Sequence, residues 1–402
     1  MRAYASRRSR RASSIVCGLG TRDESTRALE DSRPPISMFS GALTFTHEAH
    51  AAIINPAAAA IIPRRMVHSL HPRPGSRTPA PRRPPTGIMA TLPNACQLYV
   101  LIGCTAAGKS ELAVPLAERL GADVLSVDSM QVYRGMDIGT AKPPPADRAA
   151  VTHHLIDVAE PSESFSVARF VAASDLVLAG CAARRRPVLA VAGTPLYLMG
   201  LLYGLFDGPS ADPVVRDRIR RRAAEHGPPA LHAELSRVDP AAAERIHPND
   251  LRRIERALEV FELTGRPISE QQRQWSGRPR HAFTCVGLRR QRDDLSQRIN
   301  ARVRAMMAAG LLDEVRRLLA DPAGLSDQAA EATGYAELIA HCRGQCSLEE
   351  AVEAIKIHTR QLAKHQRTWF RRIREARWVD LLPGENSAGR ADEIARLLRD
   401  HA

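Results

Sequence analysis

The sequence is poor in lysine, in long apolar runs and in paired cysteines. It holds four lysines against 53 arginines, a bias more typical of a GC-rich genome than of a targeting signal. No run of about 18 uncharged apolar residues occurs, so we expect no membrane span. The seven cysteines form no paired Cys-x-x-Cys framework. This argues against a zinc site and favours reduced thiols in a cytoplasmic protein.

Positive charge is concentrated in the N-terminal segment. The net charge is +13, and residues 1–90 hold 14 arginines and five acidic residues. The remainder is nearly balanced, so the overall charge is weak evidence for nucleic acid. Residues 1–88 include a Pro/Arg-rich stretch at 71–85 and are expected to be disordered. We predict a dispensable leader or a mis-assigned start, with Met89 as the alternative start; a transit peptide is the other interpretation.

One motif in the chain is a complete phosphate-binding loop. It follows an apolar run at 98–102 and opens a helical pattern at 111–120, the context in which this motif is meaningful. Its backbone N–H groups and the helix N-terminus bind phosphate oxygens, while its lysine adds a charge and its serine hydroxyl can ligate Mg²⁺. An incidental glycine turn is the alternative. The loop residues are Gly103, Cys104, Thr105, Ala106, Ala107, Gly108, Lys109 and Ser110.

Polar side chains follow two further predicted strands. The strand at 124–127 is followed by Asp128, and the strand at 187–191 leads to Thr194. Strands that alternate with helices, such as 166–183, predict an α/β fold in which functional residues gather at the carboxyl ends of parallel strands. We therefore expect a P-loop parallel sheet with flanking helices, similar to nucleotide kinases, with both residues on the edge that carries the loop.

Beyond residue 203 the pattern becomes helical and charged. Helices at 213–226, 229–236 and 250–264 predict an all-helical insertion, and an apolar run at 283–288 returns the chain to the sheet. Helices are expected at 293–308 and 310–320, and a long one at 348–374 should end the ordered part. The predicted domains are 89–203 and 283–385 for the two parts of the core, 204–282 for the insertion and 386–402 for a tail.

The last long helix has a basic face. Its basic residues are spaced by three or four positions, and no Asp or Glu occurs between 356 and 374. Like charges at that spacing destabilise a helix unless an anion neutralises them. We predict contact with an RNA backbone, with a solvated face as the alternative. The residues are Lys356, Arg360, Lys364, Arg367 and Arg371.

Taken together, the motifs resemble bacterial tRNA dimethylallyltransferases. The resemblance covers residues 97–380, with the motifs in family order. The chain departs from the family at Cys104, where the family usually has proline, and at Ala336, where it usually has a basic residue. The matching segments are 103–110, 128–133, 137–142, 153–157, 193–197, 211–216, 247–260, 334–338 and 359–371.

The resemblance implies transfer of a dimethylallyl group from dimethylallyl diphosphate to the exocyclic amine of the adenosine beside the anticodon. The loop would then hold a diphosphate leaving group rather than a nucleotide, with Mg²⁺ on Ser110. Asp128 would be the general base, Thr194 would orient the reacting groups, and Arg216 would stabilise the diphosphate. The alternatives are a Mg²⁺-water ligand or a helix N-cap for Asp128, and a turn residue for Thr194.

The resemblance also implies contacts with the tRNA anticodon arm. For the arginines in 252–256 the alternative is a solvated surface paired with Glu255 and Glu259. We expect a monomer without membrane contact. The tRNA contacts would come from Asp128, Ser129, Met130, Gln131, Thr194, Arg216, Arg252, Arg253, Arg256, Gly334 and Tyr335, together with Lys356, Arg360 and Lys364 of the basic helix.

Two rival classes share the phosphate-binding loop. One is a P-loop kinase of a small metabolite or nucleotide. The other is a nucleotide-switched binding protein, against which the sequence shows no Asn/Thr-Lys-x-Asp motif. Cys104 has a consequence of its own: because a helix N-terminus lowers a thiol pKa, we expect alkylating reagents to inhibit the protein.

Overall fold

Six parallel strands form the central sheet, in the order β3-β2-β4-β1-β5-β6. The computed structural model describes residues 96–206, 208–272, 275 and 277–400, so the predictions for residues 1–88 lie outside the described part. The phosphate-binding loop follows β1, which lies between β4 and β5. The strands are β1 (Leu98–Gly103), β2 (Asp123–Val127), β3 (His153–His154), β4 (Val188–Ala192), β5 (Phe283–Arg290) and β6 (Ala376–Leu381).

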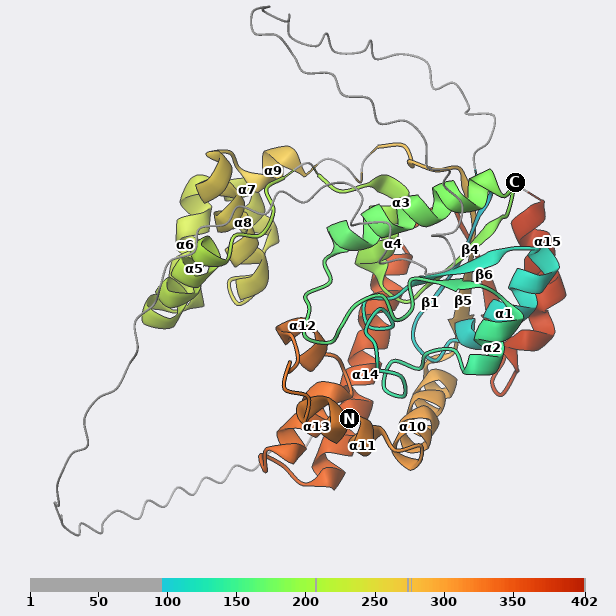
Figure 1. Cartoon of the computed structure of the whole chain (residues 1–402). Helices are drawn as coiled ribbons and strands as arrows, with labels where there is room; N and C mark the ends of the chain where they lie inside the picture. Colours follow the sequence, from blue (N-terminus) through green and yellow to red (C-terminus); the bar gives the residue numbers. More distant parts are fainter. Residues whose placement is uncertain (1–95, 207, 273–274, 276, 401–402) are drawn as a thin grey trace, which may run out of the picture. The chain divides into compact units, whose positions relative to one another are not determined.

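Helices cover both faces of the sheet (Figure 1). Other helices, α5 to α9, lie between β4 and β5 along the chain and form a separate group. Those before β5 are α1 (Lys109–Leu120), α2 (Pro145–Ala150), α3 (Val167–Ala183), α4 (Pro195–Tyr203), α5 (Pro213–His226), α6 (Pro228–Val238), α7 (Pro240–Arg245), α8 (Leu251–Thr264) and α9 (Ile268–Gln271). Those after it are α10 (Arg292–Ala308), α11 (Leu311–Leu319), α12 (Asp327–Ala330), α13 (Tyr335–Cys342), α14 (Leu348–Phe370), the 3-10 turn η4 (Ser387–Arg390) and α15 (Ala391–Arg399). The α/β fold with flanking helices is as expected.

The two faces of β1 belong to two different cores. Val100 and Ile102 pack with residues of α3, α4 and α14, whereas Tyr99 and Leu101 pack with residues of α1 and α15. Successive side chains of a strand point to opposite faces, so a strand buried on both faces is apolar at every position. That is why the run at 98–102 shows no alternation in the sequence.

The register of the sheet aligns the ends of three strands. Val127 of β2 pairs with Ala192 of β4, and Ala192 pairs with Ile102 of β1. Neighbouring strands lie roughly 5 Å apart. The residues that directly follow these three positions, Asp128, Gly193 and Gly103, therefore emerge side by side at one edge.

The helices α5 to α9 enclose an apolar core of their own. Ile219, Leu235 and Ile254 are fully buried there, on α5, α6 and α8. The helices predicted at 213–226, 229–236 and 250–264 are α5, α6 and α8, while α7 and α9 are short helices that the sequence pattern did not indicate. The division of the chain into domains stays a prediction.

The long helix does not end the ordered part, as we expected it to. It stops at Phe370, and β6 then joins the sheet beside β5, followed by α15. Figure 1 shows α15 beside α1 over one face of the sheet. Ile394 and Leu398 of α15 are fully buried against that face. The apolar spacing of these two residues in a short, charged segment was the signal that we missed.

Within the described part of the chain, no helix combines the length and the apolar character needed to cross a bilayer.

The buried position of α15 predicts a large effect of truncating one side chain. Leu398→Ala should lower the free energy of unfolding by about 2–5 kcal/mol, because it leaves a cavity between α15 and the sheet. Arg396→Ala, on the exposed face of the same helix, should change it by less than about 0.5 kcal/mol. Urea unfolding of both variants measures the difference. Equal stability of the two would show that α15 does not contribute to the core.

Candidate functional site

A cavity of about 700 Å³ opens at the aligned strand ends. The phosphate-binding loop, Asp128 and Thr194 line it, so the structure brings together these three features that the sequence placed at strand ends. The remaining walls come from α10, α14 and the segments 139–144 and 331–335.

Side chains from other parts of the protein bind three carbonyl groups of the loop. Arg298 Nε donates to the carbonyl of Ala106 at 2.9 Å, and Arg290 Nε donates to the carbonyl of Ala107 at 3.0 Å. Ser387 Oγ donates to the carbonyl of Gly108 at 2.9 Å. With its carbonyl oxygens bound in this way, the loop can present backbone N–H groups to an anion.

Gly108 begins α1 in a backbone conformation that only glycine adopts without strain. Its φ is 113°, and a Cβ at this position would lie 2.4 Å from Ser387 Oγ. The glycine of the motif is thus required both by its φ and by the close approach of η4.

Lys109 lies across the loop. Its Nζ donates to the carbonyls of Gly103 at 2.8 Å and Cys104 at 3.1 Å. Burial lowers the pKa of Lys109 to about 8, and Arg302 nearby contributes in the same direction. An anion bound in the loop would favour the charged form again.

Asp128 uses one carboxylate oxygen to order its own loop. Oδ1 accepts from the backbone N–H of Met130 at 2.9 Å and of Gln131 at 3.3 Å. Oδ2 faces Gly193, where a Cβ would lie only 2.8 Å away. No residue in the described ranges donates a hydrogen bond to Oδ2, so this oxygen is open to a group in the cavity.

Thr194 ties the end of β4 to the end of β2. Its Oγ1 accepts from the backbone N–H of Ser129 at 3.0 Å and donates to Ser129 Oγ at 3.3 Å. The hydroxyl therefore holds the segment that follows Asp128, and it lies in the cavity wall.

Two arginines of α10 complete the charged part of the cavity, and the sequence did not single them out. Arg298 binds the loop carbonyl of Ala106 and forms an ion pair with Glu111, while Arg302 lines the cavity farther along the helix. Burial lowers the pKa of Arg302, and Asp128 opposes that effect. Their spacing of four positions on a helix after β5 was the one available signal.

Apolar side chains form another wall of the same cavity. They come from two helices and include Val303 and Met306 of α10 and Ile355 and Leu362 of α14. The cavity thus combines a polar, cationic end at the loop with an apolar end between α10 and α14.

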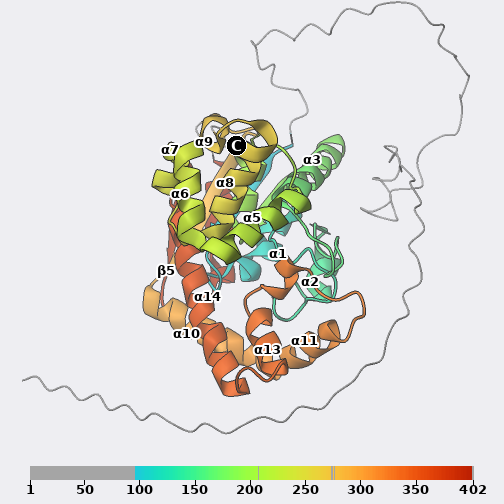
Figure 2. The same ribbon diagram turned by 90° about the vertical axis from the view of Figure 1, so that its left-hand side faces the viewer.

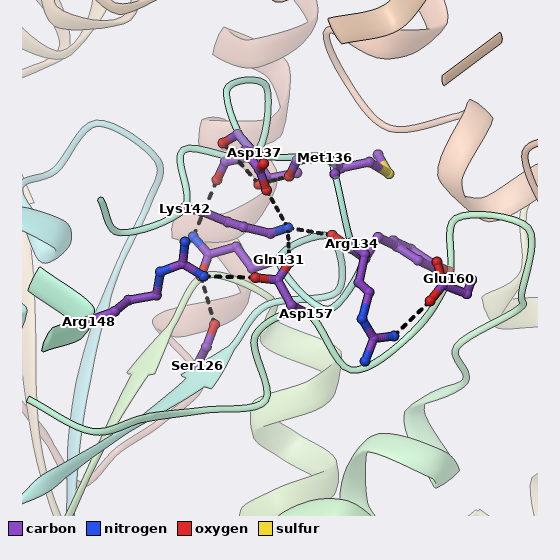
Figure 3. Close-up of polar contacts among 12 residues, drawn as sticks. Ser126, Gln131, Arg134, Met136, Asp137, Lys142, Arg148, Asp157 and Glu160 are labelled. Carbon is purple, nitrogen blue, oxygen red and sulfur yellow. Dashed lines mark hydrogen bonds and ion pairs between the residues drawn. The ribbon is translucent and has the colours of Figure 1, made fainter. Parts of the chain in front are cut away.

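The segment that follows β2 is held by internal polar contacts (Figure 3). Lys142 Nζ lies 2.7 Å from Asp137 Oδ1 and 2.5 Å from Asp157 Oδ1. Gln131 accepts from Ser126 Oγ at 2.8 Å and donates to the carbonyls of residues 140 and 141. The amide of Gln131 is thus occupied within the protein, although the residue lines the cavity.

The side chain of Tyr335 packs inside the protein, and its predicted contact with tRNA stays untested. It is fully buried, and its hydroxyl donates to Glu314 Oε1 at 2.6 Å. The same carboxylate accepts from the backbone N–H groups of residues 137, 138 and 139. Its ring leaves no room for a Cβ at Gly139. Gly334 and Tyr335 both lie in the cavity wall.

Arg216 does not line the cavity and lies in an ion-pair cluster on the insertion helices. Its Nε is 2.9 Å from Glu259 Oε1. Arg256 binds the other oxygen of Glu259 at 2.6 Å, and the carboxylate of Glu259 is fully buried. Arg252 pairs with Glu331, and Arg253 lies 3.3 Å from Asp250. In this structure Arg216 is thus bound by Glu259, and its role at the diphosphate stays a prediction.

The basic face of α14 is only partly neutralised within the protein. Lys356 forms an ion pair with Glu353, one turn earlier than the acid-free stretch. Arg360 donates to the side-chain oxygen of Asn300 at 2.8 Å. Lys364 is exposed, and no acidic group of the described residues pairs with it. Figure 2 shows α14 running beside α13.

The oxygen donors in the cavity fit a hard cation. Ser110 is exposed at the start of α1, and the carboxylate of Asp128 lines the same space. Hydroxyl and carboxylate ligands together with phosphate oxygens are what Mg²⁺ prefers in phosphate-binding sites.

A second group of possible metal ligands lies at the start of β2, away from the cavity. Asp123, His154 and Cys181 lie within 4.8 Å of one another. The carboxylate of Asp123 is already bound by Arg186 at 3.1 Å and by Arg184 at 3.2 Å. Burial alone would raise the pKa of Asp123, but hydrogen bonds from His154 and Arg186 outweigh burial and hold the pKa below its usual value. The group is therefore better described as a buried ion-pair cluster.

The expected reactivity of Cys104 is wrong. Its side chain is only 3% exposed, and burial raises the pKa of the thiol despite the nearby charges of Lys109 and Arg367. Desolvation outweighs the helix N-terminus here because the thiol points into the core between the sheet and α1.

Comparison with known families gives two matches. The model described as IPP transferase matches residues 131–373, which is more than half of the chain. The model described as isopentenyl transferase matches residues 96–158.

Individual relatives carry the same description. A protein of Symbiobacterium thermophilum named tRNA dimethylallyltransferase is 48% identical over 75% of this chain and 95% of its own length. One of Geobacillus kaustophilus with the same name is 44% identical, again over 75% of this chain and 95% of its own length.

Two solved structures are similar in fold as well. A tRNA isopentenylpyrophosphate transferase from Bacillus halodurans has a TM-score of 0.57 and 38% identity, covering 76% of this chain and 96% of its own. A eukaryotic dimethylallyltransferase described as acting on tRNA has a TM-score of 0.63 and 26% identity, covering 75% and 78%.

The pKa of Lys109 predicts how diphosphate binding depends on pH. Lys109 is charged below pH about 8 and becomes neutral as the pH rises, so affinity for inorganic diphosphate should weaken above that value. The loss should approach about tenfold per pH unit. Isothermal titration between pH 7 and 10 measures it. Lys109→Met, titrated in parallel, corrects for the ionisation of the ligand, and a constant ratio of the two affinities would rule Lys109 out.

Burial of Cys104 predicts slow alkylation. In the folded protein, iodoacetamide should modify the exposed Cys342 at least about tenfold faster than Cys104, because only an accessible thiolate reacts. Peptide mass spectrometry over a time course measures both rates. Equal rates, or protection of Cys104 by diphosphate, would restore the accessible thiol that the sequence suggested.

Proposed function

Because this chain belongs to the IPP transferase family, we propose that it transfers a dimethylallyl group from dimethylallyl diphosphate to the exocyclic amine of the adenosine beside the tRNA anticodon. Prenyl transfer to tRNA follows from the family and its relatives. The donor and the accepting atom are the proposal. The observation that carries it is the alignment of Asp128, Thr194 and the loop around one cavity.

The reaction needs stabilisation of the leaving group. Dimethylallyl diphosphate loses its diphosphate when the bond between the allylic carbon and oxygen breaks, and the electron pair leaves with that oxygen. Lys109, Arg302 and the N–H groups of the loop would bind the departing charge, and the predicted role of Arg216 at the diphosphate stays a proposal. Mg²⁺ on Ser110 would add a Lewis acid on the diphosphate.

The reaction also needs a base. The exocyclic amine of adenine is a weak nucleophile because its lone pair is delocalised into the ring. As its nitrogen bonds to the allylic carbon, its proton must move to an acceptor, and Asp128 Oδ2 is open to the cavity for that purpose. Thr194 would keep the carboxylate of Asp128 aligned with the bound adenine by holding Ser129, the next residue in the chain.

The apolar end of the cavity suits the prenyl chain. Val303, Met306, Ile355 and Leu362 would cover the five carbons and keep water from the allylic cation that develops.

The tRNA must present its base to this cavity. Adenine in the anticodon arm has to be extruded from its stack before it can reach Asp128. We propose that Arg252, Arg253 and Lys364 bind the tRNA backbone, because their side chains are exposed. We also propose that the protein acts as a monomer in the cytoplasm.

A kinase remains the second interpretation of the loop, and the relatives named above do not favour it. Protein, Mg²⁺, labelled dimethylallyl diphosphate and unmodified tRNA should yield prenylated tRNA and free diphosphate. Phosphorylation that depends on ATP, without transfer of label to tRNA, would overturn the proposal.

Asp128→Asn tests the base. Asparagine keeps the oxygen that accepts from Met130 N–H, but it replaces the basic Oδ2 with an amide group. Turnover should fall by about 100- to 10,000-fold, while affinity for inorganic diphosphate stays within about threefold. Asp313→Asn, at an exposed position on α11, serves as the control. If Asp128→Asn turns over like the wild type, Asp128 is not the base.

A further inference from the structure

One glutamine side chain joins the phosphate-binding loop to the end of β4. Gln366 lies on α14 and is 7% exposed. Its Oε1 accepts from the backbone N–H of Thr105 in the phosphate-binding loop at 2.8 Å. Its Nε2 donates to the backbone carbonyl of Gly193 at the end of β4 at 2.7 Å. A single side-chain amide thus spans the distance between β1 and β4 at the edge where the cavity opens.

The two partners fix the orientation of this amide. A backbone N–H can only donate and a carbonyl can only accept, so Oε1 must face Thr105 and Nε2 must face Gly193. Neither a carboxylate nor an aliphatic side chain can make both contacts. Glutamic acid in its ionised form would keep only the bond to Thr105, and methionine would lose both.

At one end, Gln366 fixes the loop. Thr105 is the third residue of the phosphate-binding loop, and it lies in the cavity wall. Lys109 binds the carbonyl of the preceding residue, Cys104. Both polar groups of the peptide bond between Cys104 and Thr105 are therefore bound by side chains. The loop cannot shift along the cavity without breaking one of these bonds.

At the other end, Gln366 fixes the backbone against which Asp128 rests. The N–H groups of Gly193 and Thr194 both bind the carbonyl of Val127, the residue before Asp128. The carbonyl of Gly193 is the remaining polar group of that peptide, and Gln366 binds it. Because Asp128 Oδ2 faces Gly193 at close range, movement of this peptide would move the carboxylate.

We propose that Gln366 is a positioning residue that sets the separation between the diphosphate cradle and Asp128. It rests on the proposed function, in which the leaving group lies at one of these points and the base at the other. Gln366 takes no part in bond making. A displacement of about 1 Å between reacting groups can cost about 100-fold in rate, so a fixed spacer has a measurable effect.

The basic face proposed for tRNA lies on the same helix. Lys364 stands two positions before Gln366 on α14. The element that would bind the acceptor is therefore the one that spaces the donor site from the base.

Gln366→Met and Gln361→Met test the proposal. Gln361 is exposed on the same helix and forms no part of the cavity wall, so it controls for the substitution itself. With Gln366→Met, kcat should fall by about 10- to 100-fold, while the KM for tRNA and the affinity for inorganic diphosphate stay within about threefold. Gln361→Met should match the wild type in all three quantities.

Hydrogen–deuterium exchange of the free protein gives a second measurement that needs no turnover. Exchange in peptides covering 103–110 and 190–196 should rise in Gln366→Met and stay unchanged in Gln361→Met. Gln366→Glu, which keeps the acceptor for Thr105, should release the second peptide more than the first. Prenyl transfer by the wild type is scored separately, so its absence would refute the proposed function while these exchange results still test the spacer.

A kcat within twofold of the wild type, or unchanged exchange in both peptides, would overturn the positioning role. Equal losses in kcat, diphosphate affinity and tRNA affinity, with a lower melting temperature, would also overturn it, because they would show a purely structural residue.

Discussion

The parallel register of β2, β4 and β1 is the constraint on which the site depends. It brings the residues after Val127, Ala192 and Ile102 to one line at the sheet edge, before any side chain makes a contact. A shift by one residue in either strand pair would turn Asp128 toward the opposite face and away from the loop. The buried side chains on both faces of β1 hold that register, so the packing of the core and the geometry of the cavity are one problem.

Two cationic side chains beside the loop are buried away from water. Lys109 and Arg302 both have a lowered pKa because burial disfavours their charged forms. In the free protein this arrangement costs stability, since an unfolded chain would keep both groups fully hydrated. A bound diphosphate supplies the missing negative charge, so its binding offsets the cost in stability of burying these two cations. The loop carbonyls, bound by Arg298, Arg290 and Ser387, cannot offset that charge themselves.

The sequence predicted those parts of the site that a local motif encodes. The loop, Asp128 and Thr194 each follow an apolar strand, and the rule that parallel strands end at a common edge was enough to group them. The sequence did not predict the roles of Arg298, Arg302 and Gln366. Their partners lie more than 150 positions away, and nothing in their own helices distinguishes them from surface residues. For Arg216, the resemblance could not show that Glu259 binds it in this structure, and its predicted role stays untested. The final helix was missed because nine residues give little periodicity, whereas its buried face becomes obvious once α1 lies beside it.

Asp128 has two oxygens, and the structure gives them different tasks. Oδ1 orders the turn after β2 by accepting from the N–H groups of Met130 and Gln131, and it caps no helix, because none begins between β2 and α2. Only Oδ2 remains for either a proton or a cation, and it cannot take both at once. A cation bound directly to Oδ2 would lower its proton affinity at the moment when the amine must lose its proton. If Mg²⁺ lies on Ser110 and the diphosphate, as the proposed function requires, the base must stay outside its inner coordination sphere. The spacing that Gln366 maintains between the loop and Gly193 is what would keep the two apart.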